Sequence, residues 1–331
     1  MPNLAIVVRQ TTIDQDFGRL IDPYRRELYA HCYRMLGSAH DAEDLLQETY
    51  LRAWKGYERF EGRSSLRTWL HRIATTACLT ALEKRNRRPL PTNLGRPTRE
   101  PEGEPAHNPE APWLEPMPDR LGIGDEDPGA VVATRDSVRL ALVAAMQYLP
   151  AKQRAVLILR EVLRFSAAEV ARILDTTVPA VNSLLQRARA QIDKALPEQE
   201  KIGEPSTEQR ELLDRYVAAF ESYDIGALID LFTAEATFEM PPFATWVRGP
   251  EHIVRLIHAQ CPAEEPGDLA LVPTAANGQP AYGMYLREND GPHRAFGIHV
   301  LTLRPQGIGH CAVFFDTTLF PLFDLPPTLD R

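Results

Sequence analysis

Residues 166–192 have the sequence SAAEVARILDTTVPAVNSLLQRARAQI, which is the pattern of two helices joined by a tight turn. Ser166 and Glu169 form a capping box, which starts the first helix. Thr177 is a suitable cap for the second helix, and Pro179 falls in the first turn, where proline is favoured. Such a pair predicts a helix-turn-helix, whose second helix enters the major groove of DNA. A helical hairpin inside a bundle is the alternative.

The second helix of this pair has an apolar stripe and a polar face. We expect the apolar stripe to be buried; it comprises Val181, Leu184, Leu185, Ala188, Ile192 and Leu196. The outward face supplies the predicted DNA contacts, which are Pro179, Asn182, Ser183, Gln186, Arg187 and Arg189. Bases are read mostly by the N-terminal end of a recognition helix, so Arg187 and Arg189 are expected nearer to phosphates than to bases.

A strongly basic segment lies upstream of the helix-turn-helix. Residues 52–88 contain ten basic and three acidic residues, a net charge of +7, although the whole chain has a net charge of −8. Residues 205–331 contain 17 acidic and 8 basic residues, a net charge of −9. The acidic total therefore hides a localised basic footprint of the kind that binds nucleic acid.

A predicted amphipathic helix leads into this basic segment. Its apolar face is formed by Ala42, Leu45, Leu46, Thr49, Tyr50, Ala53 and Trp54. Its opposite face is acidic and polar, with Asp41, Glu43, Asp44, Gln47 and Glu48. A solvated helix face is the simplest interpretation of these carboxylates. Their position directly before a basic stretch also favours a surface that binds a second partner.

The next predicted helix covers residues 66–85 and has two stripes. Its buried stripe is expected to contain Leu66, Trp69, Leu70, Ile73, Ala77 and Ala81, with Trp69 in the core. Its second stripe and the loop before it carry hydroxyls and arginines that suit phosphates and base edges, namely Arg63, Ser64, Ser65, Arg67, Thr68, His71, Arg72, Thr75 and Thr76. The Gly/Ser-rich loop could receive an unstacked base, and the simpler interpretation is an ordinary N-cap at Ser64 or Ser65.

Composition divides the chain into five parts. Residues 14–88 and 131–196 have helical periodicity, and residues 207–325 mix helical and alternating patterns. Residues 89–130 hold 10 prolines and 5 glycines, which predicts a disordered or extended linker. Residues 197–206 form a second, short linker.

The C-terminal part is predicted to be an α+β domain. Its pattern gives three helices and extended runs near residues 236–240, 245–247, 268–275, 280–288, 294–304 and 309–320. Residues with catalytic chemistry are Glu239, His252, His258, His293, His299, His310 and Asp316. A catalyst would need an acid and a base that converge, and single histidines on strands are more often structural. We therefore predict no catalytic residues and no enzymatic activity.

Several classes of site are not expected. The four cysteines, Cys32, Cys78, Cys261 and Cys311, are scattered without metal-ligand spacing, so we predict no metal site, no disulfide framework and no cofactor. No apolar run in the first half is long enough to span a bilayer, and the N-terminus lacks the pattern of a secretory signal. The expected compartment is the cytoplasm, with no membrane partner.

Several motifs now occur in a specific order. Residues 41–54, DAEDLLQETYLRAW, and residues 59–88, RFEGRSSLRTWLHRIATTACLTALEKRNRR, resemble region 2 of the sigma factors of RNA polymerase. Residues 149–192, LPAKQRAVLILREVLRFSAAEVARILDTTVPAVNSLLQRARAQI, resemble region 4 of the same proteins. With these two regions alone, the chain resembles an extracytoplasmic-function sigma factor of the sigma-70 family. The resemblance implies two all-α DNA-binding domains, a region 2 helical bundle and a region 4 helix-turn-helix.

This resemblance also implies partners and roles. The β′ subunit of core RNA polymerase would be bound by Asp41, Asp44, Gln47 and Glu48. The β subunit of the polymerase would be a second partner. The loop 59–65 and the following helix would read the −10 element of promoter DNA, and the helix Val178–Ala195 would read the −35 element. The linker would pass through a polymerase channel that normally carries RNA, with residues 112–116, PWLEP, as an anchor inside it.

Residues 235–257, EATFEMPPFATWVRGPEHIVRLI, resemble the SnoaL-like fold, an α+β cone. Members of that fold include polyketide cyclases and steroid isomerases, but many only bind ligands or dimerise. The resemblance favours a domain that regulates the sigma regions in cis, with a possible small-molecule ligand. For this domain, the alternatives are a purely structural role and a fused cyclase. For the whole chain, the alternative is a ligand-responsive regulator that uses only the helix-turn-helix. A separate anti-sigma partner also remains open.

Overall fold

The structure is a computed structural model that describes residues 17–84, 87–123, 135–196, 205–287 and 291–330. It divides into two compact units that interleave along the sequence. The first unit comprises Met1–Asn86, Leu121–Thr134 and Ala145–Glu198, and the second comprises Arg87–Arg120, Arg135–Ala144 and Gln199–Arg331. The chain therefore passes repeatedly between the two units. The predicted linker 197–206 falls almost entirely outside the described residues, as do residues 14–16 and 124–134.

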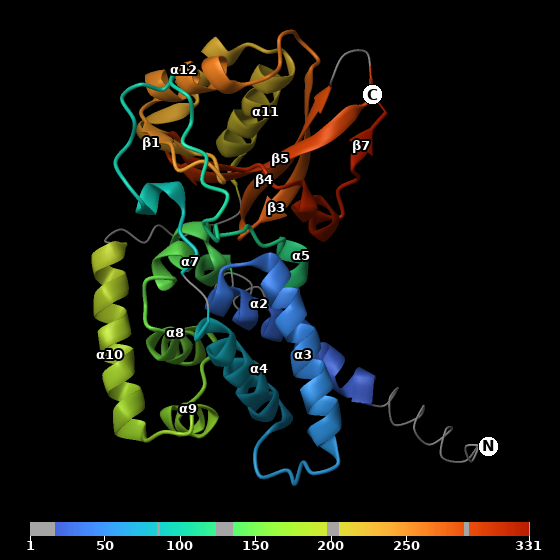
Figure 1. The fold of residues 1–331 in the computed structure, drawn as a ribbon, viewed down its shortest axis with the longest axis vertical. Helices are drawn as coiled ribbons and strands as arrows, with labels where there is room; N and C mark the ends of the chain where they lie inside the picture. Colours follow the sequence, from blue (N-terminus) through green and yellow to red (C-terminus); the bar gives the residue numbers. More distant parts are fainter. Residues whose placement is uncertain (1–16, 85–86, 124–134, 197–204, 288–290, 331) are drawn as a thin grey trace, which may run out of the picture. The chain divides into compact units, whose positions relative to one another are not determined.

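The N-terminal part of the first unit is a helical bundle (Figure 1). The 3₁₀ turn η1 (Asp22–Tyr24) precedes α2 (Arg25–Leu36), α3 (Ala39–Tyr57) and α4 (Leu66–Leu82). Helix α2 ends at Gly37, whose φ of 71° is left-handed and suits glycine. Ser38 then caps α3 by accepting a hydrogen bond from the Asp41 amide at 3.1 Å. The core of this bundle is centred on α2, where every residue from Leu28 to Leu36 is buried.

The rest of the first unit contains the helix-turn-helix. Helix α8 (Ala151–Leu157) continues into a π-helical turn (Ile158–Val162), followed by α9 (Ala167–Ile173) and α10 (Val178–Ala195). The predicted capping box is confirmed, because Ser166 Oγ accepts from the Glu169 amide at 3.2 Å and Glu169 Oε2 accepts from the Ser166 amide at 2.8 Å. Asp175 turns the chain in the left-handed region with φ of 49°. Short helices α5 (Asp119–Gly122) and α7 (Leu140–Met146) lie where the chain changes units.

The second unit is built on one mixed sheet. Its strands are β1 (Phe232–Glu239), β2 (Trp246–Arg248), β3 (Leu269–Ala276), β4 (Gln279–Arg287), β5 (His293–Arg304), β6 (Gly307–Phe314) and β7 (Thr328–Leu329). They have the order β2-β1-β6-β5-β4-β3, with β7 paired to β5. Strands β1 and β6 pair in parallel, and the other pairs are antiparallel.

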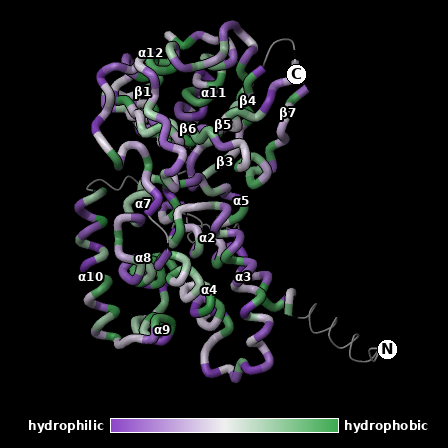
Figure 2. Tube along the Cα trace, in the orientation of Figure 1, coloured by the Kyte–Doolittle hydropathy of each residue, from purple (hydrophilic) through white to green (hydrophobic). Residues whose placement is uncertain are grey.

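Helices complete the apolar core of this unit. They are α11 (Thr207–Glu221) and α12 (Pro250–Gln260), with 3₁₀ segments η4 (Ile225–Asp230) and η5 (Thr317–Phe323). Figure 2 shows the apolar residues that recur along the strands and these helices. The last predicted extended run, 309–320, is partly wrong, since β6 ends at Phe314. Asp316 then caps η5 by accepting from the Thr318 amide at 3.0 Å.

The segment predicted as a linker needs the largest correction. Residues 87–120 pack within the second unit, with a 3₁₀ turn η2 at Pro91–Asn93 and with Leu114 and Met117 fully buried. The segment serves both edges of the sheet: the Thr98 amide donates to the Trp246 carbonyl of β2 at 2.9 Å, and Pro118 bridges Ala276 of β3. Edge strands carry backbone groups that need partners, and a polar, proline-rich chain can supply them without an apolar period.

The predicted polymerase-channel anchor lies in this segment. Trp113 is 9% exposed, and its indole Nε1 donates to the Asn108 carbonyl at 2.9 Å. Arg88 Nη1 donates to the Trp113 carbonyl at 2.9 Å, and the Leu114 amide donates to the Pro89 carbonyl at 3.0 Å. In this structure the tryptophan is therefore anchored by its own chain.

Candidate nucleic-acid interface

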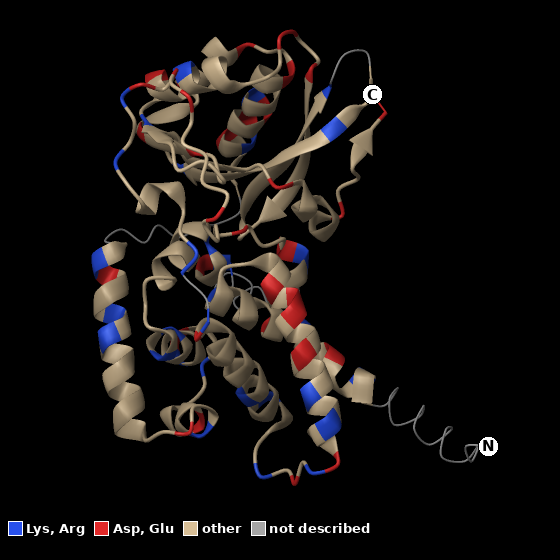
Figure 3. Ribbon diagram, viewed as in Figure 1, with Lys and Arg blue, Asp and Glu red and all other residues tan. Residues whose placement is uncertain are grey.

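The polar face of α3 lies on the surface of the first unit. Asp44, Gln47 and Glu48 are exposed and Asp41 is half-buried, whereas the predicted apolar residues Ala42, Leu46 and Ala53 are buried. Glu48 accepts a hydrogen bond from Arg52 one turn later, at 2.5 Å. Figure 3 shows carboxylates along the first half of α3 and cationic residues along its second half. The expected acidic face is therefore present and accessible.

The loop before α4 is exposed and hydrophilic. Arg63 has 84% of its side chain exposed and pairs with Glu61, and Gly62 has φ of 68°. Ser65 caps α4 by accepting from the Thr68 amide at 3.1 Å, so the N-cap interpretation holds for this serine. Ser64 is half-buried, and its hydroxyl donates to the Ser65 carbonyl at 3.3 Å.

Helix α4 differs from its predicted orientation. Thr68, His71 and Thr75 are 4%, 0% and 0% exposed, and only Arg72 and Thr76 of the second stripe face solvent. In the stripe predicted to be buried, Leu70 and Ala77 are buried, but Leu66, Trp69, Ile73 and Ala81 are half-buried. The reason is that α4 packs against α2 and α3 and also against α8 and α9, so most of its circumference is covered.

Polar side chains of α2 pair with His71 and Thr75 on the inward side of α4. His71 Nε2 lies 2.7 Å from Glu27 Oε1, and Thr75 Oγ1 lies 3.0 Å from His31 Nε2. Burial alone would raise the pKa of Glu27, but hydrogen bonds from His71 and Arg67 outweigh it and lower that pKa to about 2. Burial lowers the pKa of His71 and of His31, so both rings are held neutral.

Arg67 joins the two helical parts of the first unit. Its Nε and Nη2 donate to the Glu27 carboxylate at 2.7 and 2.8 Å, and Nη2 also donates to the Leu163 carbonyl at 2.9 Å. The guanidinium lies 4.3 Å above the ring of Phe165. Thr68 Oγ1 lies 3.5 Å from Glu169 Oε1 of the capping box. The candidate DNA-reading helix α4 is thus in contact with the helix-turn-helix.

Helix α10 presents its predicted face to solvent. Every expected DNA contact on it is exposed, whereas Val181, Leu185, Ala188 and Ile192 are buried; the exposed residues are Pro179, Asn182, Ser183, Gln186, Arg187 and Arg189. Arg189 pairs with Glu161 at 2.6 Å, so part of its charge is neutralised. The N-terminal half of α10 offers the side-chain amides of Asn182 and Gln186 and the hydroxyl of Ser183, which suit base edges.

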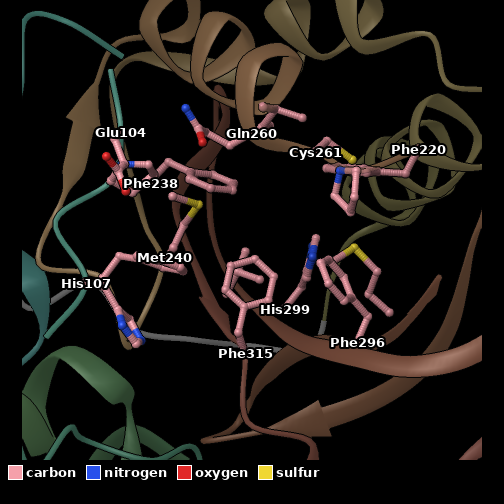
Figure 4. A pocket seen from close by; sticks show the side chains of 16 residues that line it. Glu104, His107, Phe220, Phe238, Met240, Gln260, Cys261, Phe296, His299 and Phe315 are labelled. Carbon is pink, nitrogen blue, oxygen red and sulfur yellow. The ribbon is translucent and has the colours of Figure 1, made fainter. Parts of the chain in front are cut away.

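The second unit contains an apolar cavity of about 720 Å³ (Figure 4). Of the seven residues with catalytic chemistry, only His299 lines it. Glu239 is buried elsewhere, where it accepts from the Thr92 amide at 2.8 Å and lies 2.7 Å from His310 Nε2. Glu239 and His310 therefore meet outside the lining of the cavity, to which only His299 of the seven belongs. Sequence analysis missed Tyr216 and His107, which belong to this region, because neither stands in a recognisable motif.

Metal-ligating residues do not gather within the described ranges, where no group of three or more His, Cys, Asp or Glu could hold an ion. The cysteines are free; Cys32, Cys78 and Cys311 are buried and Cys261 is half-buried. In the same part of the chain, every helix is too short or too polar to cross a lipid bilayer.

Comparison with known families and proteins gives consistent matches. Residues 20–88 match Sigma-70 region 2, residues 139–192 match Sigma-70, region 4, and residues 213–308 match the SnoaL-like domain. The chain is 57% identical over 318 residues to the ECF RNA polymerase sigma factor SigG of Mycobacterium tuberculosis, covering 95% of this chain and 85% of that protein. It is 28% identical over 306 residues to SigJ of the same organism, covering 88% of each.

A solved structure has the same architecture. The crystal structure of the Mycobacterium tuberculosis extracytoplasmic-function sigma factor SigJ matches with a TM-score of 0.59 and 22% identity, covering 93% of this chain and 99% of that one. The predicted fold class, two helical domains and an α+β SnoaL-like domain, is thereby confirmed.

Proposed function

The chain belongs to the extracytoplasmic-function sigma factors of RNA polymerase, and we propose that it directs promoter-specific initiation through three surfaces of the first unit. These are the acidic face of α3 for core polymerase, the 59–65 loop with α4 for the −10 element, and α10 for the −35 element. The observation that carries this proposal is the exposed polar face of α10, held on a capped helix-turn-helix whose opposite stripe is buried. Such a protein acts in the cytoplasm, where the polymerase and the promoter are.

Core polymerase would bind the exposed carboxylates of α3. Asp44, Gln47 and Glu48 lie on one accessible face, and their main-chain scaffold is fixed by the buried stripe beneath them. Charge complementarity on an exposed face sets the association rate and the choice of partner. A repressor that uses only a helix-turn-helix has no need of this face.

Reading of the −10 element would require the first unit to open. Thr68, His71 and Thr75 are covered by α2 and by the helix-turn-helix. A promoter spacer of about 16–18 base pairs spans roughly 55–60 Å at about 3.4 Å per pair, which two helical parts in direct contact cannot cover. We therefore take the described arrangement as a closed form of the factor. Polymerase would provide the binding energy that separates α4 from α9.

The second unit would regulate this opening in cis and would not act as an enzyme. One support is that only His299 of the seven catalytic candidates lines the cavity, whereas the Glu239–His310 pair lies outside that lining. The other is the segment 87–120, which joins the two sigma regions yet packs within the second unit. A change in how firmly that segment packs in the second unit would therefore change how far the two sigma regions can separate.

The test is transcription in vitro with core polymerase and the full chain on a cognate promoter. Added full-length factor should give promoter-specific transcripts. Substitutions on α3 should weaken binding to core polymerase, and substitutions on α10 should change which promoters are transcribed. A chain that binds promoter DNA without core polymerase and gives no transcript with it would contradict the sigma assignment and favour a helix-turn-helix regulator.

A further inference from the structure

We propose that the apolar cavity of the second unit binds a neutral, flat ring compound that carries a hydrogen-bond acceptor oxygen, and that residues 102–108 form one wall of this site. We call residues 102–108 the strap. The binding proposal stands on the cavity alone. Its regulatory consequence rests on the proposed function, because the strap belongs to the segment between the two sigma regions.

The size and lining of the cavity fit a small organic molecule. A volume of about 720 Å³ lies within the roughly 300–1,000 Å³ of ligand pockets. Five phenylalanines line it, namely Phe220, Phe238, Phe243, Phe296 and Phe315. Ring centroids of Phe296 and Phe315 are 5.1 Å apart, and those of Phe243 and Phe315 are 6.2 Å apart. Aromatic walls of this kind favour flat rings, which stack or meet them edge to face.

His299 is a wall residue with a buried ring nitrogen that lacks a partner among the described residues, and we assign the specificity of the site to it. His299 Nδ1 lies 2.6 Å from the hydroxyl of Tyr216, while its Nε2 is buried and has no partner among the described residues. A phenol is the better donor and an imine nitrogen the better acceptor, so Tyr216 donates to Nδ1 and Nε2 keeps its proton. Burial lowers the pKa of His299 to about 3, so the ring stays neutral. His299 therefore offers one N–H donor to an acceptor oxygen.

Charge excludes anions from the site. Neither lysine nor arginine is among the residues that line the cavity, whereas Glu104 is. An anionic ligand would lose its hydration without a cation in exchange, which is costly in an apolar cavity. A neutral ketone, ether or amide oxygen meets the His299 donor without that cost.

The strap closes one side of the cavity and is held by several contacts. Glu102 accepts two hydrogen bonds from Arg255 of α12, at 2.5 and 2.9 Å, and Gln260 donates to the Gly103 carbonyl at 3.1 Å. The Ala106 amide donates to Thr245 Oγ1 at 2.8 Å. Figure 4 shows Glu104 and His107 of the strap on the same side of the cavity, apart from His299. The imidazole of His107 packs on Phe243, with ring centroids 5.2 Å apart.

A ligand that fills the cavity would contact the strap and hold it in place. Glu104, Pro105 and His107 all line the cavity, so the occupant adds contacts to the docked strap that an empty cavity lacks. Ligand binding is thus coupled to the docking of the chain that joins the two sigma regions, because a ligand stabilises the conformation that binds it better.

The experiment uses the full-length chain and three probes of one shape: fluorenone, fluorene and fluorene carboxylate. Dissociation constants are measured by ligand-observed NMR. Fluorenone should bind, fluorene should bind about five-fold more weakly for want of the acceptor, and the carboxylate should not bind measurably. Saturable fluorenone binding supports the site, and its absence overturns it.

Variants locate the binding. Cys261→Trp fills the cavity from a half-buried position and should weaken fluorenone binding at least ten-fold, whereas His258→Trp on the exposed side of α12 should leave it unchanged. The His299→Phe variant should bind fluorenone and fluorene about equally. A purely structural role of His299 would leave the ratio of the two dissociation constants unchanged. Equal binding by wild type and Cys261→Trp, or a retained preference in His299→Phe, overturns the proposal.

Hydrogen exchange tests the strap. Saturating fluorenone should slow exchange of the Ala106 amide at least three-fold, and an unchanged rate overturns the coupling. These readouts involve no polymerase. A chain that binds fluorenone but fails to direct transcription refutes the proposed function and leaves the site standing, and a transcribing chain that does not bind fluorenone refutes the site alone.

Discussion

Arg154 of α8 donates a hydrogen bond through Nη1 to the backbone carbonyl of Met35, near the end of α2. Its Nη2 donates to the Gln147 carbonyl at 2.9 Å, and only 3% of the residue is exposed. Burial lowers the pKa of this arginine to about 10, so it remains a cation at neutral pH. One buried guanidinium thus joins the helix-turn-helix part of the first unit to the N-terminal bundle.

Replacing this arginine should loosen that joint. Arg154→Met retains the length of the side chain but leaves the carbonyls of Met35 and Gln147 without their donor, which should lower the free energy of unfolding by about 3 kcal/mol. Urea unfolding, together with hydrogen exchange of the α2 and α8 amides, measures the effect. Lys152→Met on the exposed side of the same helix is the matched control. Equal stability of the two variants would show that the joint contributes nothing.

The contact between α4 and α9 should prevent transcription when it is made permanent. Thr68 and Glu169 approach to 3.5 Å across this contact. A Thr68→Cys/Glu169→Cys chain treated with a short thiol-specific cross-linker is expected to lose promoter-specific transcription, because α4 stays covered. Each chain with only one of the two substitutions, treated in the same way, is the control, because it keeps the four native cysteines but lacks the second added thiol. Full activity of the cross-linked chain would contradict a closed form that has to open.

Acid should weaken the first unit through Glu27. Its pKa is about 2 in the folded chain, below the ordinary value of 4.5, so the unfolded chain binds the proton more tightly. The stabilisation from this carboxylate is therefore complete above about pH 4.5 and is lost as the pH falls toward 2. Glu27→Gln should be less stable than wild type at pH 7, and the difference should shrink across that window. Urea midpoints at a series of pH values measure it, and parallel curves would contradict the assignment.

Charge reversal on α3 should separate core binding from folding. Asp44→Lys/Glu48→Lys places two cations on the exposed acidic face and should weaken association with core polymerase at least ten-fold, with little change in the unfolding midpoint. A pull-down with core enzyme and a thermal melt give the two readings. Glu58→Lys, exposed at the other end of the helix, is the control. Undiminished binding by the folded double variant would refute a role for this face.

Substitutions on α10 should divide into base-reading and phosphate-binding effects. Asn182→Ala should change the preference at one position of the −35 element by about 1–3 kcal/mol. Arg187→Gln, nearer the middle of the helix, should weaken binding evenly across sequences and reduce the salt slope by about one. A library of −35 sequences, assayed at several salt concentrations, distinguishes these outcomes. Altered base preference in Arg187→Gln with none in Asn182→Ala would reverse the assignment.

Local signals predicted much of this molecule. The caps at Ser166 and Thr177 and the apolar stripe beginning at Val181 depend only on neighbours in sequence. The structure shows both caps as expected, and it buries the stripe except for Leu184 and Leu196, which are half-buried. The extended runs likewise predicted most of the sheet, although β4 and β6 are buried along nearly their whole length and show little alternation. The exposed polar face of α10 follows from the same periodicity.

The failures involve partners that lie far away in the sequence. Thr75 is buried against His31 of α2, and His71 is buried against Glu27 of the same helix. The periodicity of α4 alone reveals neither partner. Trp69 is only half-buried, and its ring packs on Phe60 of the loop before α4, with ring centroids 4.8 Å apart. Residues 87–120 have the composition of a free linker, yet their backbone pairs with the edges of the sheet.

This interleaving has a consequence for how such proteins can be recombined. Leu114 and Met117 owe their burial to the second unit, and the Met117 amide donates to Asn277 Oδ1 at 2.9 Å. Truncation after residue 204 therefore does not remove a self-contained domain. It removes the residues that bury Leu114 and Met117, and the segment 87–120 remains in the truncated chain without them. A chimera between relatives should fold only when residues 87–120 and the C-terminal part come from the same parent. The two stretches have to be exchanged together, although most of the residues that separate them in the sequence belong to the other unit.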